Sequence, residues 1–118
     1  MNSGYDYLRA NKAILESNYP YEAKQGACQA SNIASTDVSV SLFNYVSPYD
    51  GSQIKAALAT GPVGVAINGG SRPFQFYRSG IFNCDYVTCG NEASDLNHAV
   101  LLVGYGVEGS TEYFILKN

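Results

Sequence analysis

The feature of this chain that most constrains its fold is a pair of apolar segments near its end. Residues 99–103 read Ala-Val-Leu-Leu-Val and residues 113–116 read Tyr-Phe-Ile-Leu. A Gly-Tyr-Gly sequence and a polar turn lie between them, so we predict a hairpin of strands 99–105 and 112–116. His98, the single histidine of the chain, heads the first strand, and Asn118 follows the second. A histidine and an asparagine at the ends of neighbouring strands can form the orienting hydrogen bond that one kind of nucleophilic catalysis requires.

The first part of the chain is predicted to contain one helix and one strand. Apolar residues recur on one face of the segment 5–17, which predicts a helix that Tyr19-Pro20-Tyr21 ends. Residues 22–36 form a polar connection. Apolar and polar side chains then alternate over 38–42, and this period of two predicts a strand.

The middle of the chain is predicted to add a short helix and a strand. Asp50 can cap a helix that runs to Ala59 and stops at Gly61-Pro62. Residues 63–67 are a predicted strand that turns at Asn68-Gly69-Gly70, followed by an aromatic segment at 72–82 and a polar loop at 83–95. We therefore expect an antiparallel, barrel-like unit with a helix packed at its edge.

The composition excludes several classes of partner. Seven basic and ten acidic residues give a net charge of −3 without a basic run, so nucleic acid is not an expected partner. The apolar segments are too short to span a bilayer, and the first residues do not resemble a signal peptide. Ten tyrosines, no tryptophan and 14% charged residues are more typical of a secreted or lumenal protein than of a cytosolic one.

Four blocks of sequence occur in an order that matches one protein family. They are Tyr19-Pro20-Tyr21 followed by Cys28, the Gly61-Pro62-Val63-Gly64-Val65-Ala66 segment, the Phe74-to-Ile81 segment with its Tyr77 and Gly80, and Asn97 to Gly106 with Tyr113 to Asn118. Together they resemble the motifs of papain-like cysteine peptidases, and of cathepsin L-like enzymes in particular. The resemblance covers essentially all of the chain.

The resemblance implies an α+β, papain-like fold. Residues 1–18 would be the end of the helical domain, and residues 19–118 would be the antiparallel β-barrel domain, truncated at its C-terminus. It also implies that His98 is the general acid/base and that Asn118 orients it. An apolar pocket for the substrate would be lined by Met1, Ala66, Leu96, Asn97 and Ala99.

The nucleophile of this family is expected to lie outside the chain. The family places its histidine about 130–150 residues after a Cys-Gly-Ser-Cys-Trp sequence, whereas only 97 residues precede His98. The glutamine of the oxyanion hole lies upstream as well. We therefore expect a C-terminal-half fragment of a longer enzyme, inactive and only marginally stable by itself.

The three cysteines are candidates for disulfides. Cys28 resembles a family cysteine that bonds to the missing half, and Cys89 resembles one whose partner follows Lys117-Asn118. Cys84 is additional, so Cys84 and Cys89 could bond to each other or either could take the distal partner. A zinc site at these cysteines and His98 would lack a fourth ligand, so no metal is expected. No cofactor is implied either.

Two functions fit the family resemblance. In the first, the parent is a cysteine endopeptidase, lysosomal or secreted, which hydrolyses peptides or proteins through a Cys thiolate–His imidazolium pair. In the second, it is a non-catalytic relative that binds peptides or a partner. The presence of both His98 and Asn118 favours the first. The resemblance further implies a propeptide and cystatin-like inhibitors as partners, a monomeric full-length form, and no membrane association. An unrelated tyrosine-rich binding module would require four accidental matches.

Overall fold

The computed structural model describes residues 1–90 and 92–118, which form two compact units, residues 1–45 and 46–118. The first unit contains the helix α1 (Asn2–Ala10) and the 3-10 helix η1 (Ala30–Asn32). The second contains α2 (Gly51–Leu58), β1 (Val63–Ile67), α3 (Arg72–Gln75), α4 (Tyr86–Cys89), η2 (Ala93–Asp95), β2 (His98–Glu108) and β3 (Thr111–Lys117). The predicted boundary between family domains at residues 18 and 19 stays a prediction. Within the described residues, no helix has the length and apolar character needed to cross a bilayer.

The first helix is shorter than its periodicity predicts. It ends at Ala10, because Asn11 adopts an extended conformation with φ of −134° and ψ of 159°. Beyond it, the backbone N–H of Ala13 donates to the carbonyl of Val38 at 2.8 Å. The chain thus pairs with a distant segment where a helical ladder was expected, and the prediction of a helix through residue 17 is wrong.

The alternating segment 38–42 does not form a strand, so this prediction is wrong. The backbone N–H of Val40 donates to the carbonyl of Leu8, near the end of α1, at 3.1 Å. A strand needs a neighbouring strand for its ladder, and this segment has a helix end and an irregular loop beside it. The ring of Phe43 lies 5.3 Å from that of Tyr5, centroid to centroid, and fixes the segment against α1.

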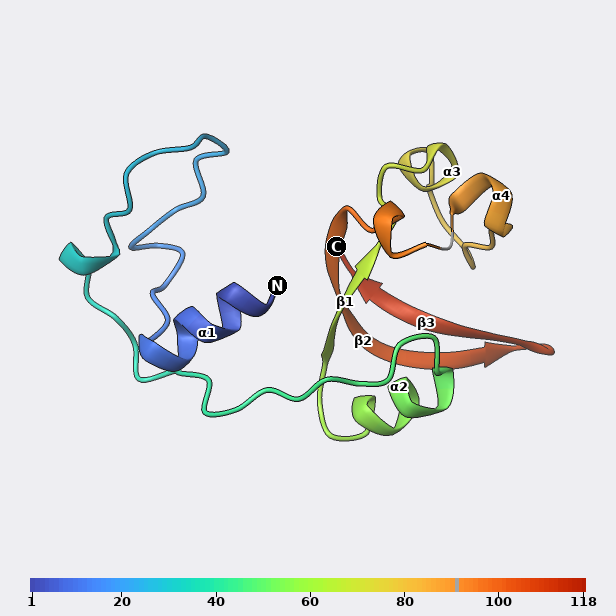
Figure 1. Cartoon of the computed structure of the whole chain (residues 1–118), viewed down its shortest axis with the longest axis horizontal. Helices are drawn as coiled ribbons and strands as arrows, with labels where there is room; N and C mark the ends of the chain where they lie inside the picture. Colours follow the sequence, from blue (N-terminus) through green and yellow to red (C-terminus); the bar gives the residue numbers. More distant parts are fainter. Residues whose placement is uncertain (91) are drawn as a thin grey trace. The chain divides into compact units, whose positions relative to one another are not determined.

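The second unit is built on an antiparallel sheet of three strands in the order β1-β2-β3 (Figure 1). Within the described residues, its buried apolar core consists of two side chains of the central strand, Val100 and Leu102, which are 7% and 5% exposed. Val100 is the register partner of Val65 in β1, and Leu102 is that of Leu116 in β3. The central strand is therefore the element that the rest of the unit covers.

The sequence predicted the position of the sheet and its helix well. The carboxylate of Asp50 accepts the N–H groups of Ser52 and Gln53, which begins α2 as expected. The hairpin strands are longer than predicted and meet at Gly109, which has a φ of +63°. The fold is α+β with an antiparallel sheet of three strands, the portion of the expected barrel that this chain contains.

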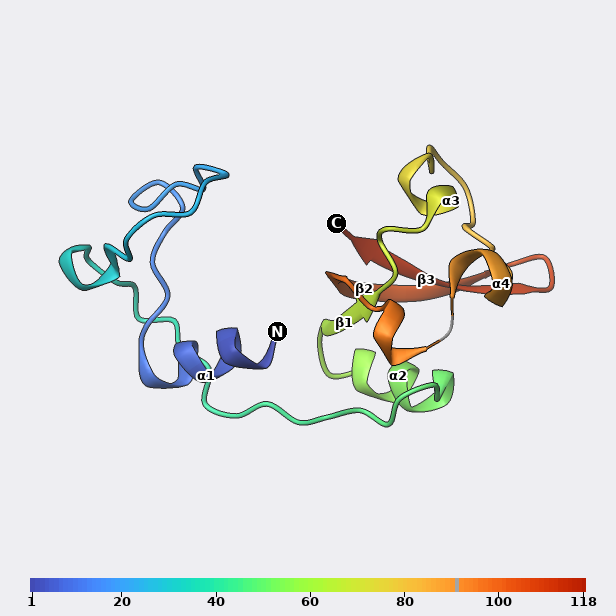
Figure 2. The ribbon, with the colours of Figure 1, turned by 45° about the horizontal axis from the view of Figure 1, so that its top comes forward.

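The segments that join the strands lie close to the start of β2. The helices α3 and α4 are neighbours (Figures 1 and 2), and both fall between β1 and β2 in the chain. The predicted polar loop 83–95 therefore contains two helical turns, α4 and η2. The side chain of Asp85 accepts the N–H of Thr88 and begins α4, a capping signal that the sequence analysis overlooked.

Candidate active site

The proposed catalytic pair is a direct contact in the structure. His98 begins β2, Asn118 follows β3, and His98 Nε2 lies 2.8 Å from Asn118 Oδ1. The hairpin explains this proximity, since Leu101 of β2 is the register partner of Lys117 in β3. Two residues 20 positions apart in the sequence are thus held at one end of the sheet.

The chemistry of the partner atom fixes the tautomer of the histidine. An amide oxygen only accepts hydrogen bonds, so Nε2 of His98 carries a proton and donates a hydrogen bond to Asn118 Oδ1. The other ring nitrogen, Nδ1, is then the one free to accept or deliver a proton. Because asparagine cannot take the proton itself, its hydrogen bond can only restrict the orientation of the imidazole ring.

An open hollow of about 430 Å³ adjoins the pair. Its lining comprises Gly69, Phe74, Gln75, Tyr77, Asn97, His98 and Asn118. The ring of Phe74 lies 6.4 Å from the imidazole and meets Phe82 edge to face at 5.7 Å. The imidazole of His98 is therefore open to this hollow beside an aromatic wall.

A turn after β1 forms the wall on the other side of His98. The backbone of Gly69 lies so close to the histidine that a Cβ there would be 2.6 Å from His98 Cβ. Asn97 fastens this turn: its Oδ1 accepts the N–H of Gly70 at 3.1 Å, and its Nδ2 donates to Asn68 Oδ1 at 3.1 Å. The strand end and the turn are thus connected through side-chain amides.

Two of the three cysteines form a disulfide. Cys84 and Cys89 are bonded across α4, with their Cα atoms 6.0 Å apart, so of the pairings left open by the sequence the local one is found. Cys28 is an exposed free thiol in the other unit. Hydrogen bonds from the backbone and hydroxyl of Thr88 hold the pKa of Asp85, between the two bonded cysteines, below its ordinary value. Among the described residues, no group of three potential metal ligands is found.

The predicted pocket residues are partly brought together. Ala66 and Ala99 are register partners on β1 and β2, so their side chains are cross-strand neighbours. Leu96 is 45% exposed just before β2, and Asn97 lines the hollow. Met1 lies in the other unit, at the N-terminus of α1, and its role in a pocket stays a prediction.

Three residues that lie around His98 were not among the predicted site residues. Asn68, Gly69 and Phe74 were assigned only to a turn and to an aromatic segment. The sequence did contain a signal for this placement: the Asn-Gly-Gly turn directly follows the predicted strand 63–67, and His98 directly precedes the predicted strand 99–105. In the structure Ile67, the last residue of β1, is the register partner of His98. Antiparallel pairing of these two predicted strands places the turn after the first beside the histidine at the start of the second.

Comparison with known proteins decides the family. The sequence profile described as papain family cysteine protease matches residues 1–118. The chain belongs to the papain family of cysteine proteases. Vignain of Phaseolus vulgaris is 40% identical over 121 residues, and digestive cysteine proteinase 2 of Homarus americanus is 37% identical over 122, both covering 100% of the chain. Among solved structures, procathepsin L2 from the larval midgut of Tenebrio molitor matches all of the chain with a TM-score of 0.81 and 34% identity.

These papain-family relatives are much longer than this chain. The match covers 32% of vignain, 36% of the lobster proteinase and 36% of procathepsin L2. The chain therefore spans about a third of the length of its relatives. The α+β fold predicted from the motifs is confirmed by the likeness to procathepsin L2.

Proposed function

We propose that this chain carries the general acid/base part of a cysteine peptidase active site. The hydrogen bond of 2.8 Å between His98 Nε2 and Asn118 Oδ1 is the observation that supports this role. It leaves Nδ1 facing away from asparagine, available to pair with a thiolate. The cysteine that supplies the thiolate, and the glutamine of the oxyanion hole, belong to a part of the protein outside these 118 residues.

The proposed reaction proceeds through a thioester. The thiolate attacks the carbonyl carbon of a peptide bond, and the C–N bond breaks as Nδ1 of His98 gives its proton to the leaving amine. Water then attacks the thioester while Nδ1 takes a proton from it, which releases the acid and restores the thiolate–imidazolium pair. Asn118 remains hydrogen-bonded to Nε2 throughout and holds the ring in one orientation.

The chain by itself is proposed to hydrolyse no peptide bond. Cys84 and Cys89 are oxidised to a disulfide and cannot attack a carbonyl. Cys28 is an exposed free thiol, but Gln29 follows it where the nucleophile of the family is followed by tryptophan.

We infer the substrate class and location of the whole protein from the family resemblance and from the predicted pocket residues. We propose a bulky apolar side chain beside Ala66, Leu96 and Ala99, with Asn97 completing this part of the site. The digestive relatives and the disulfide are consistent with an oxidising compartment, secreted or lysosomal. A propeptide, cystatin-like inhibitors and a monomeric state are proposed on the family resemblance.

The test is the peptidase activity of the protein encoded by the complete transcript around this chain. His98→Ala should lower kcat/KM for a fluorogenic peptide by at least about 10²-fold, and Asn118→Ala by about 10²-fold through misplacement of the ring. Asn83→Ala, at an exposed position of the same unit, is the control and should change little. A complete protein that binds peptides but does not cleave them would favour the non-catalytic alternative.

A further inference from the structure

Asn68 joins two segments that the sequence places far from it. Its Nδ2 donates to the carbonyl of Cys89, 21 residues away, at 2.8 Å, and its Oδ1 accepts from Asn97, 29 residues away, at 3.1 Å. An asparagine in a plain turn bonds to its own backbone two residues on. Here the side chain forms long-range bonds instead, one to the disulfide loop and one to the residue that precedes His98.

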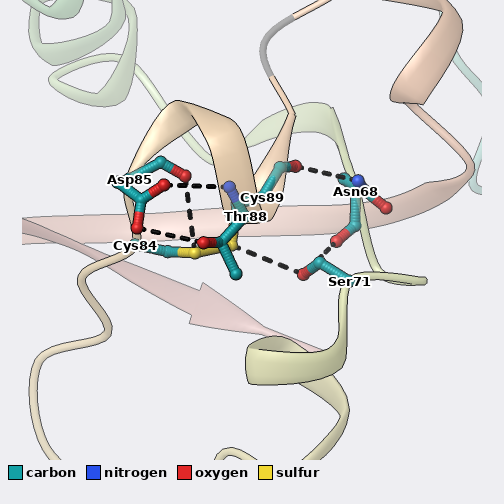
Figure 3. Close-up of a disulfide and its surroundings, with 6 residues drawn as sticks. All are labelled: Asn68, Ser71, Cys84, Asp85, Thr88 and Cys89. Atoms are coloured by element: carbon teal, nitrogen blue, oxygen red, sulfur yellow. Dashed lines mark hydrogen bonds between the residues drawn. A yellow bond between two sulfur atoms is a disulfide. The ribbon is translucent and has the colours of Figure 1, made fainter.

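A second connection runs beside the first (Figure 3). The hydroxyl of Ser71, whose side chain is buried, lies 3.1 Å from the carbonyl oxygen of Asn68 and 3.6 Å from Cys89 Sγ. Figure 3 shows the disulfide, α4 and these two residues as one connected group. The loop closed by Cys84 and Cys89 is therefore fixed to the end of β1 by a hydrogen bond to a backbone carbonyl, and Ser71 lies against its sulfur atom.

The end of β1 in turn bounds the histidine. Ile67 is the register partner of His98, and its carbonyl accepts the N–H of Asn97 at 3.1 Å. The backbone of Gly69 lies so close to the histidine side chain that there is no room for a Cβ at this position. A displacement of this turn must therefore move the wall against which His98 rests.

We propose that Asn68 is a positioning residue for His98, holding the turn beside the imidazole to the loop closed by Cys84 and Cys89. The proposal rests on the role of His98 given above. Asn68 touches no reacting atom and acts through the turn and Asn97. The disulfide acts on the orientation of the imidazole through the loop that Asn68 bonds at the carbonyl of Cys89.

The orientation can be measured without catalysis, because His98 is the only histidine in the chain. In the 118-residue chain labelled with ¹⁵N-histidine, the rate of solvent exchange of the Nε2 proton reports on the hydrogen bond to Asn118. Asn68→Ala should raise this rate at least about fivefold, the factor that corresponds to one hydrogen bond of ordinary strength. Asn83→Ala is the control, and Asn118→Ala gives the rate for an imidazole without its partner.

A double-mutant cycle distinguishes positioning from general loosening. Replacing both Cys84 and Cys89 by serine should raise the exchange rate when Asn68 is present and have little further effect in Asn68→Ala. The amide exchange of Leu102 should not change in Asn68→Ala, since the sheet core is remote from the amide bridge. Asn68→Asp keeps the acceptor for Asn97 and loses the bond to Cys89, so it should give an intermediate exchange rate. If the alanine variant does not fold, the rate in Asn68→Asp tests the proposal.

Three results would overturn the proposal: an Nε2 exchange rate within twofold of the wild type in the Asn68 variants, a parallel rise at Leu102, or additive effects of the Asn68 and cysteine changes. An exchange rate in the wild type as fast as in Asn118→Ala would instead remove the basis of the proposed function. The failure of one inference is thus separable from the failure of the other.

Discussion

Removal of the Cys84–Cys89 disulfide gives a stability change whose size follows from the structure. The bond closes a loop with a sequence separation of five. In the chain-entropy description, closing so short a loop stabilises the folded state by about 2 kcal/mol. The double variant Cys84→Ser/Cys89→Ser should therefore lose about 2 kcal/mol, and with an m-value of about 1–2 kcal/mol/M its urea midpoint should fall by about 1–2 M.

The assay must report on the unit that contains the disulfide. A urea titration followed through the amide resonance of Leu102, a core residue of the second unit, meets this need. Cys28→Ser, which makes the same chemical change at an exposed free thiol, is the matched control and should leave the midpoint unchanged. A loss below about 0.5 kcal/mol in the double variant would contradict the loop-closure reasoning, because it would mean that the unfolded chain gains little freedom.

Three further changes test the packing, the cap and the free thiol. Leu102→Ala should destabilise the second unit by about 2–5 kcal/mol in urea denaturation, whereas Val103→Ala, at a position 46% exposed, should cost far less; equal losses would contradict the assigned core. Because the pKa of Asp85 is lowered on folding, its contribution to α4 is present above the ordinary 3.8 and is lost as the pH falls through the folded value. The protection factor of the Thr88 amide, which is its intrinsic exchange rate divided by its observed rate at the same pH, should therefore fall in acid, and an unchanged protection factor would contradict this cap. One thiol, Cys28, should react with a disulfide reagent in the folded chain and all three cysteines after reduction and unfolding; three reactive thiols in the folded chain would exclude the disulfide.

The parts of the fold that the sequence predicted correctly are those with a local signal. The Asp50 cap and the Gly61-Pro62 stop delimit α2 closely. The hairpin follows from two apolar runs and the turn between them, and the contact between His98 and Asn118 follows from the hairpin. For these elements the information lies within the element or in its immediate neighbour.

The parts that the sequence did not predict depend on distant partners. The helical periodicity of residues 5–17 gives way after Ala10 because Ala13 bonds to Val38. The alternation at 38–42 gives no strand, because the segment bonds to the end of α1 and to the loop after it. The amide bridge of Asn68 joins three segments, and no single window of sequence contains it.

The pairing of His98 with a thiolate is the central claim, and its most direct test is the pH dependence of alkylation of the nucleophile in the complete protein. A cysteine held beside an imidazolium stays a thiolate well below the ordinary thiol pKa of about 8.5. We predict fast reaction with iodoacetamide in mildly acidic buffer, and in His98→Ala a profile that rises only near the ordinary thiol pKa. A profile that is unchanged by His98→Ala would contradict the assignment of His98 as the partner of the nucleophile.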